Sequence, residues 1–148
     1  MTPEQVLGKS ETEHSHQAAF FCWLQNNKHL QPGFEFAYAV PNGGQRGKRE
    51  AARFVAEGVK RGVPDVVIPI PTWTTGVDSG GEPLNLIQYC GLYIEFKKPS
   101  LEKSMKGTVT DPDQIRYRDY LLSQNYSHFV AFHYLKAVEF TIKYLTQE

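Results

Sequence analysis

The fold signal is strongest in Gly62-Val63-Pro64-Asp65-Val66-Val67-Ile68 and in Leu92-Tyr93-Ile94-Glu95-Phe96-Lys97-Lys98. Both segments read as short strands. The first is β-branched and follows a Gly and a Pro, and the second alternates so that Ile94 and Phe96 share one face while Glu95 and Lys97 share the other. If the two strands pair antiparallel, Asp65 lies beside Glu95. Two carboxylates and one ammonium group then meet at one point.

Such a group of charges suits a hard divalent cation. Mg²⁺ prefers oxygen ligands and usually takes only one or two protein carboxylates. A lysine beside it could orient a water or meet the charge that develops on a phosphate. The pattern Pro64-Asp65 followed by Glu95-Phe96-Lys97 resembles the PD-(D/E)xK nuclease superfamily. The same Glu-x-Lys also occurs as a solvated pair on exposed strands, so the rest of the chain must decide between the two readings.

Composition places narrow limits on the protein. The 148 residues predict one domain over 12–148, able to bury about two-thirds of its unfolded surface, behind a flexible leader over 1–11. Sixteen basic and sixteen acidic residues give no net charge, so any nucleic-acid site must be a local patch. No apolar stretch resembles a signal peptide or a membrane span. We therefore expect no membrane partner and a cytoplasmic location. Cys22 and Cys90 have neither the spacing of a zinc site nor that of a disulfide framework.

A helix is predicted from Thr12, its N-cap, to about Asn27. Its apolar stripe, with Leu24, continues at the N-terminal end into Glu13 and Gln17, so Glu13 either faces a polar site or serves only the helix dipole. His14 and His16 point in different directions on such a helix. We therefore expect exposed histidines and not a metal pair.

A strand is predicted over 34–40 and a basic helix over 48–59. Between Arg46 and Arg61 six residues are basic and two are acidic, directly after a Gly-rich turn whose amides could meet phosphates. The alternative is a solvated helix face with internal ion pairs. The candidate contacts to nucleic acid are Asn42, Gly43, Arg46, Lys48, Arg49, Arg53 and Lys98.

The second half of the chain continues the alternation of elements. Residues 72–90 have the composition of a long mobile loop. A helix then starts at Asp111-Pro112 and runs to about Ser123; Gln114 at its third position is either part of a capping box or part of a site. A strand over 127–133 and a helix over 136–145 complete the chain.

The order of elements predicts an α/β fold with the αβββαβ core of the PD-(D/E)xK, restriction-endonuclease-like class, a mixed central sheet flanked by helices. Taken together, the motifs resemble the virus-type replication-repair nuclease (VRR-NUC) family, in particular its stand-alone phage and bacterial members, over residues 12 to about 145. The resemblance rests on Thr12 to Gln17, Pro41 to Gly44, Glu57 to Asp65, Gly91 to Lys97 and Pro112 to Gln114.

That resemblance implies a structure-selective DNA endonuclease that uses Mg²⁺ or Mn²⁺ and no nucleotide cofactor. The metal ligands would be Asp65, Glu95, Glu13 and the main-chain carbonyl of Phe96. Lys97 would be the catalytic lysine, with Gln114 beside it. The family further implies a homodimer that cuts branched DNA, above all four-way (Holliday) junctions. A nuclease for flaps, ends or duplex and a catalytically inactive nucleic-acid-binding module remain as alternatives.

Overall fold

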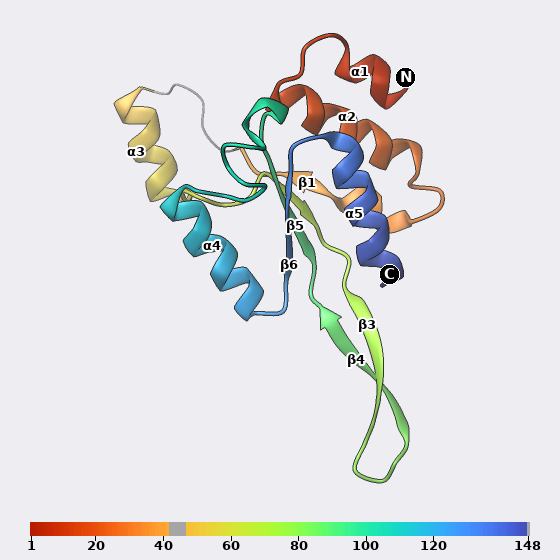
Figure 1. Cartoon of the computed structure of the whole chain (residues 1–148). Coiled ribbons are helices and arrows are strands. Elements are labelled where there is room, and N and C mark those ends of the chain that lie inside the picture. Colours follow the sequence, from red (N-terminus) through yellow and green to blue (C-terminus); the bar gives the residue numbers. More distant parts are fainter. Residues whose placement is uncertain (42–46, 148) are drawn as a thin grey trace.

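The computed structural model describes residues 1–41 and 47–147, and at its centre lies a four-stranded sheet in the order β1-β2-β5-β6 (Figure 1). The strands are β1 (Tyr38–Ala39), β2 (Val66–Ile68), β5 (Leu92–Phe96) and β6 (Ser127–Ala131). β2 is antiparallel to β1 and β5, whereas β5 and β6 run parallel. This mixed sheet, flanked by helices, confirms the predicted fold class.

The predicted pairing of the two central strands is present. β2 and β5 pair antiparallel with Val66 opposite Ile94 and Ile68 opposite Leu92. All three residues of β2 are buried, because helices cover both faces of the sheet. Asp65, which directly precedes β2, therefore lies at the same end of the sheet as Glu95.

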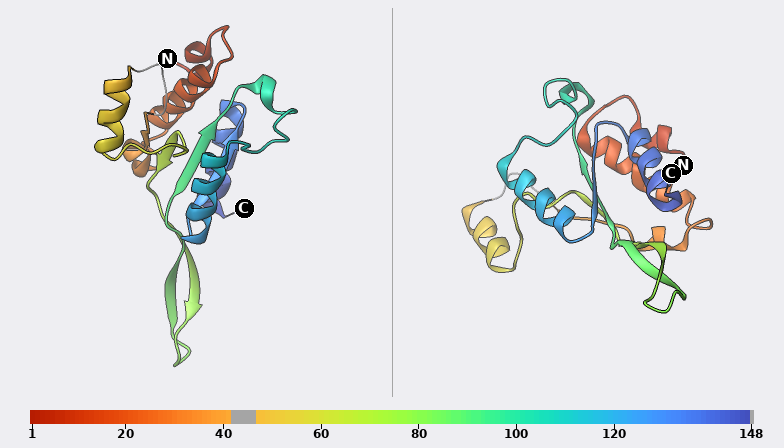
Figure 2. Two further views of the ribbon diagram at one scale, coloured as in Figure 1. Left: turned by 90° about the vertical axis from the view of Figure 1, so that its left-hand side faces the viewer. Right: turned by 60° about the horizontal axis from the view of Figure 1, so that its bottom comes forward.

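Helices form a layer on each side of the sheet. α2 (Glu13–Asn26) and α5 (Tyr134–Thr146) lie on one face, and α4 (Pro112–Ser123) lies on the other (Figure 2). α2 begins where the sequence predicted, since the Thr12 side chain accepts a hydrogen bond from the Ser15 amide. Its Phe20 and Leu24 are fully buried in the core.

Two segments near the N-terminus differ in detail from the prediction. Within the leader predicted over 1–11, residues Pro3–Leu7 form the short helix α1, and Tyr134 donates a hydrogen bond of 2.8 Å to Glu4. The strand predicted over 34–40 is reduced to β1, because Pro32–Phe36 form a 3₁₀ turn, η1. The Gln31 side chain and Pro32 cap this turn, so local turn chemistry overrides the alternating pattern.

The prediction of a mobile loop over 72–90 is wrong. It forms a two-stranded antiparallel hairpin of β3 (Thr72–Val77) and β4 (Pro83–Tyr89), which projects well beyond the sheet (Figure 1). The turn is built by Asp78, whose carboxylate accepts the amides of Gly80 and Glu82. Gly81 adopts φ +83°, which favours glycine. The prediction failed because it relied on the polar, Gly-rich composition of the turn. The β-branched and apolar residues on either side of the turn form two paired strands.

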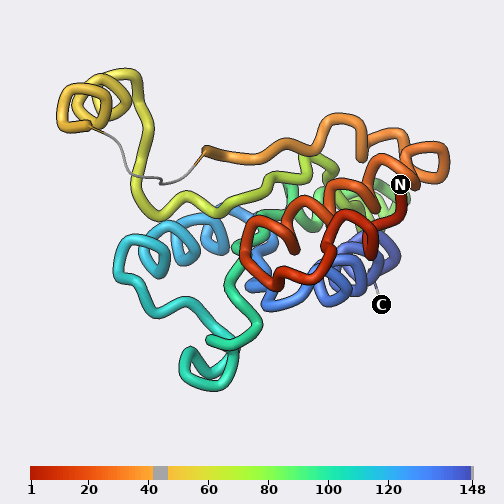
Figure 3. Tube along the Cα trace, turned by 90° about the horizontal axis from the view of Figure 1, so that it is seen from above, coloured from red at the N-terminus to blue at the C-terminus, as the bar shows by residue number. Residues whose placement is uncertain are grey.

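Two further elements border the site. α3 (Lys48–Ala56) stands outside the layers, on the same side of the molecule as α4, and the turn η2 (Pro99–Leu101) follows β5 (Figure 3). None of the helices in the described part of the chain is long and apolar enough to cross a membrane.

Candidate active site

Two carboxylates meet at the end of the central strands, as the alternation of residues predicted. Asp65 Oδ2 accepts a hydrogen bond of 2.7 Å from the amide of Phe96, so the residue before β2 is tied to the last residue of β5. Glu95 precedes Phe96 on the same strand. The Phe96 ring enters the core, and its backbone stays at the site.

Glu95 is held by two donors. The residue is only 3% exposed, although the alternation of β5 alone placed it on a polar face. Lys97 Nζ lies 3.0 Å from Glu95 Oε1, and Gln114 Nε2 donates to the same oxygen at 2.7 Å. A buried carboxylate needs such donors, since an unpaired charge in the interior is strongly unfavourable.

Gln114 joins the site because of how α4 begins. Asp111 Oδ1 accepts the amides of Asp113 and Gln114, which makes Asp111 the N-cap, as predicted. The Gln114 side chain does not complete a capping box but turns to Glu95. Its Oε1 is buried and has no hydrogen-bond partner among the described residues, so the site holds an unused oxygen acceptor.

The electrostatics of Glu95 set it apart from an ordinary glutamate. Burial raises its pKa and the negative charges of Asp65 and Glu13 act in the same direction; against the opposing effect of Lys97, together they bring it to about 7. Glu13, the first residue of α2, is partly buried and thus acts on the same site from a third element. Three carboxylates therefore act on this site together, and the ammonium group of Lys97 opposes their effect on the pKa of Glu95.

This donor set fits a hard divalent cation. Asp65, Glu95 and Glu13 supply carboxylate oxygens, and a cation among them would relieve the repulsion that raises the pKa of Glu95. Carboxylate and carbonyl oxygens suit Mg²⁺, Ca²⁺ and Mn²⁺. The predicted ligands therefore have the chemistry of the predicted metal.

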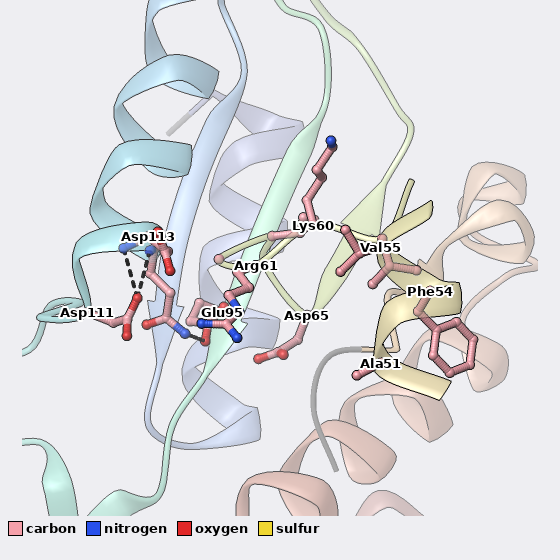
Figure 4. A pocket seen from close by; sticks show the side chains of 13 residues that line it. Ala51, Phe54, Val55, Lys60, Arg61, Asp65, Glu95, Asp111 and Asp113 are labelled. Carbon is pink, nitrogen blue, oxygen red and sulfur yellow. Dashed lines mark hydrogen bonds between the residues drawn. The ribbon is translucent and has the colours of Figure 1, made fainter. Parts of the chain in front are cut away.

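A cavity of about 470 Å³ opens over Asp65, Glu95 and Gln114. Figure 4 shows α3 and α4 on its two sides, with the carboxylates between them. Lys60 and Arg61, in the segment before Asp65, also line this cavity. Sequence reasoning counted both in the basic cluster but did not select them for the site, because the spacing of charges alone does not show which cations face a cleft.

Gly62 explains how this segment can lie so close to α4. It has φ +81°, and a Cβ at this position would come within 2.4 Å of the carbonyl group of Asp113. Only glycine permits both the conformation and the contact. The segment that carries Lys60 and Arg61 therefore passes close to the first turn of α4 at the edge of the cavity.

The residues predicted to contact nucleic acid are distributed unevenly. Asn42, Gly43 and Arg46 lie outside the described residues. The others are exposed and do not line the cavity; they are Lys48, Arg49, Arg53 and Lys98. Arg53 lies 3.8 Å from Glu57 and over the ring of Phe54, as the alternative of a solvated helix face predicted for part of α3.

A second cluster of ligand-type atoms lies elsewhere. Atoms of Glu11, His16 and His133 fall within 4.8 Å of one another. His16 is fully buried, so the prediction that it is exposed was wrong: it packs under the start of α5 and accepts the amide of Tyr134 through Nδ1. His133 likewise accepts the amide of Leu135. Because a neutral imidazole has one lone pair, both rings have already used theirs, and the cluster lacks the donors of a metal site.

The fold is the PD-(D/E)xK-type α/β core that the order of elements predicted, and Asp65, Glu95 and Lys97 lie together at one end of its central strands. Among solved structures, the chain is similar to one described as "VRR_NUC domain protein", with 26% identity and a TM-score of 0.65, over 94% of this chain and 92% of that one. This match supports the assignment of the chain to the VRR-NUC family, as the motifs predicted. No family model matches the sequence, and no curated protein matches it.

Proposed function

We propose that the chain is a metal-dependent nuclease that hydrolyses phosphodiester bonds in branched DNA. The observation that carries the proposal is the convergence of Asp65, Glu95, Lys97 and Gln114 at one end of the sheet, in a fold similar to a VRR_NUC domain protein. A surface Glu-x-Lys pair would not need a buried carboxylate, two donors to it and two further carboxylates nearby.

Each side chain has a role that follows from its contacts. Asp65, Glu95, Glu13 and the Phe96 carbonyl would hold Mg²⁺ or Mn²⁺, which supplies Lewis-acid activation of water and of the phosphoryl group when bound. The Phe96 amide fixes Asp65, and Gln114 fixes Glu95, so both carboxylates are oriented before substrate arrives. The ammonium group of Lys97 orients the nucleophile and offsets charge in the transition state.

The finer proposal follows the family resemblance. Two copies of the chain form a homodimer whose two sites nick opposing strands of a four-way junction. Lys60 and Arg61 at the cavity, with the basic residues of α3 further out, contact backbone phosphates. Such contacts give strong salt dependence and little sequence preference.

The test is cleavage of labelled four-way junction, flap and plain duplex in Mg²⁺ and in Mn²⁺, beside Glu95→Ala and Lys97→Ala. Symmetric nicking of the junction, lost in both variants, is the expected result. Cleavage of only flap or duplex would retain the nuclease and reject the junction. Binding of DNA without any cleavage in either metal would leave only the nucleic-acid-binding module.

A further inference from the structure

The cavity over the carboxylates does not end at Gln114. A second cavity, of about 440 Å³, adjoins it and shares Lys60, Arg61 and Asp113 with it. The second cavity continues along α4 to Arg116, Tyr117 and Tyr120. Together with Asp113, these residues follow helical spacing, with Arg116 and Tyr117 three and four positions after Asp113 and Tyr120 one turn further on, so one face of α4 lines the whole path. We refer to this second cavity as the α4 groove.

The charges of the α4 groove favour an anionic occupant. It has three cations, Lys60, Arg61 and Arg116, against the single carboxylate of Asp113. None of these three cations takes part in an ion pair found among the described residues, whereas Arg53 and Arg118 do. Cations that line a cleft without a protein partner are suited to phosphate oxygens.

The aromatic residues of the groove favour bases. Tyr120 is 63% exposed, and its ring stacks on no other aromatic ring in the described part of the chain. An exposed ring in a groove lined by cations is the arrangement with which proteins bind single strands, since bases stack on the ring while basic side chains follow the backbone. Bases within a duplex already stack on each other and offer no free face.

We propose that the α4 groove binds an unpaired strand of the DNA substrate as it leaves the cleavage site, with a base stacked on Tyr120 and phosphates at Lys60, Arg61 and Arg116. This proposal rests on the nuclease function and extends its substrates, beyond the fully paired four-way junction, to DNA with a single-stranded segment next to the branch. The shared lining of the two cavities makes the path continuous. A docking surface for a second protein chain is the competing use of the same face.

The test measures binding in EDTA, so that cleavage plays no part. The probes are a duplex with a short single-stranded flap, the same duplex without it, and the flap with 2-aminopurine next to the branch. The variants are Tyr120→Ala, Tyr120→Phe, which keeps the ring, and Leu122→Ala, an exposed residue of the same helix outside the groove.

We expect Tyr120→Ala to weaken flap binding about tenfold and to abolish quenching of 2-aminopurine. Binding of the plain duplex should stay unchanged, as should flap binding by Tyr120→Phe and Leu122→Ala. Arg116→Ala should lower the slope of log affinity against log salt by about 0.7 on the flap, with Lys143→Ala, on α5, as the matched control.

Four results would overturn the proposal: no binding of the flap by the wild type, no loss in Tyr120→Ala, an equal loss on plain duplex, or a changed oligomeric state of Tyr120→Ala in sedimentation. The last would assign this face to a protein partner. Cleavage assays separate the two proposals. If Glu95-dependent cleavage occurs but Tyr120 has no effect on binding, the groove fails alone; if flap binding depends on Tyr120 but no metal supports cleavage, the nuclease fails alone.

Discussion

Two glutamate–lysine contacts in this molecule have nearly the same N···O distance, but the pKa values of their carboxyl groups are shifted in opposite directions. Glu95 lies 3.0 Å from Lys97 at the site, and Glu139 lies 3.1 Å from Lys136 on the surface of α5. The Glu95 side chain is 4% exposed and its pKa is raised to about 7. The Glu139 side chain is 49% exposed, and its hydrogen bond with Lys136 holds its pKa below the ordinary range.

The difference shows which effect dominates at each place. On α5, water solvates the carboxylate and the lysines merely favour its charge. At the end of β5, removal of water disfavours the charged form, and the charges of Asp65 and Glu13 act in the same direction, so one lysine cannot compensate. An ion pair at a given distance is therefore no sign of function. Burial of the carboxylate together with neighbouring like charges is the feature that points to a functional site.

The largest difference between the two contacts should appear in the rate of DNA cleavage when each glutamate is replaced by alanine. We expect Glu95→Ala to lower the rate of DNA cleavage roughly 10³-fold, because a metal ligand contributes several kcal/mol to stabilising the transition state. Glu139→Ala should cleave as the wild type does. Single-turnover cleavage with saturating metal measures the rates of both variants. A similar loss in the two would show that burial does not distinguish the role of Glu95 from that of Glu139.

The second effect is on stability without metal. A pKa of about 7 in the folded state, against 4.5 for the ordinary group, means that the folded protein binds the proton more tightly than the unfolded chain. Stability that this proton supplies is present below pH 4.5 and is lost as the pH rises through 7. The loss amounts to about 3 kcal/mol.

Denaturant unfolding in EDTA from pH 4.5 to 8 can measure this loss. The wild type should lose about 3 kcal/mol of unfolding free energy relative to Glu95→Gln, whose amide does not titrate. Glu139→Gln should follow the wild type across the range. Parallel curves for the wild type and Glu95→Gln would show that the environment of Glu95 does not shift its pKa.

The lysines should differ by a smaller factor. Lys97→Ala removes the ammonium group beside the reacting phosphate, and we expect a loss of about 10²-fold in the cleavage rate. Lys136→Ala, with an equally short contact to a glutamate, should have no effect on cleavage. Circular dichroism would verify that both variants are folded, and full activity of Lys97→Ala would contradict a catalytic role.

The smallest effect should be that of Gln114, which touches Glu95 and not the substrate. Gln114→Leu keeps the volume but removes the donor, so the carboxylate loses its fixed orientation; we expect about tenfold weaker metal affinity or activity. Gln124→Leu, at the exposed end of the same helix, is the control. Titration of Mn²⁺ into both variants would decide, since equal affinities would confine Gln114 to a structural role.

Local patterns were enough to predict the frame of the site. Alternation in β5, the Pro64-Asp65 turn and the Asp111-Pro112 helix start each depend on neighbours in sequence, and the structure has all three. Antiparallel pairing of the two strands was the condition for placing Asp65 beside Glu95, and the structure meets this condition with Val66 opposite Ile94.

What the sequence could not supply depends on contacts between distant segments. The burial of Glu95 and of His16, and the close approach of Gly62 to α4, come from packing that no periodicity encodes. The 3₁₀ turn at Pro32 and the β3–β4 ladder were missed for another reason. In both segments, hydrogen bonds of turn residues determine the local structure, whereas the predictions relied on composition or on alternation.

The β3–β4 hairpin is also a place where the sequence can tolerate insertions and deletions. It leaves the central sheet after the last β2–β5 pair, Ile68 with Leu92, and its base is fastened by the hydroxyl of Tyr144, which donates to the Ile70 carbonyl at 2.6 Å. The ring of Tyr89 also contacts Tyr144 at this base, and beyond it the tip projects away from the other elements of the described chain (Figure 1). Insertions, deletions or a grafted peptide at residues 78–82 can therefore alter the outline of the molecule while the spacing of Asp65 and Glu95 stays the same.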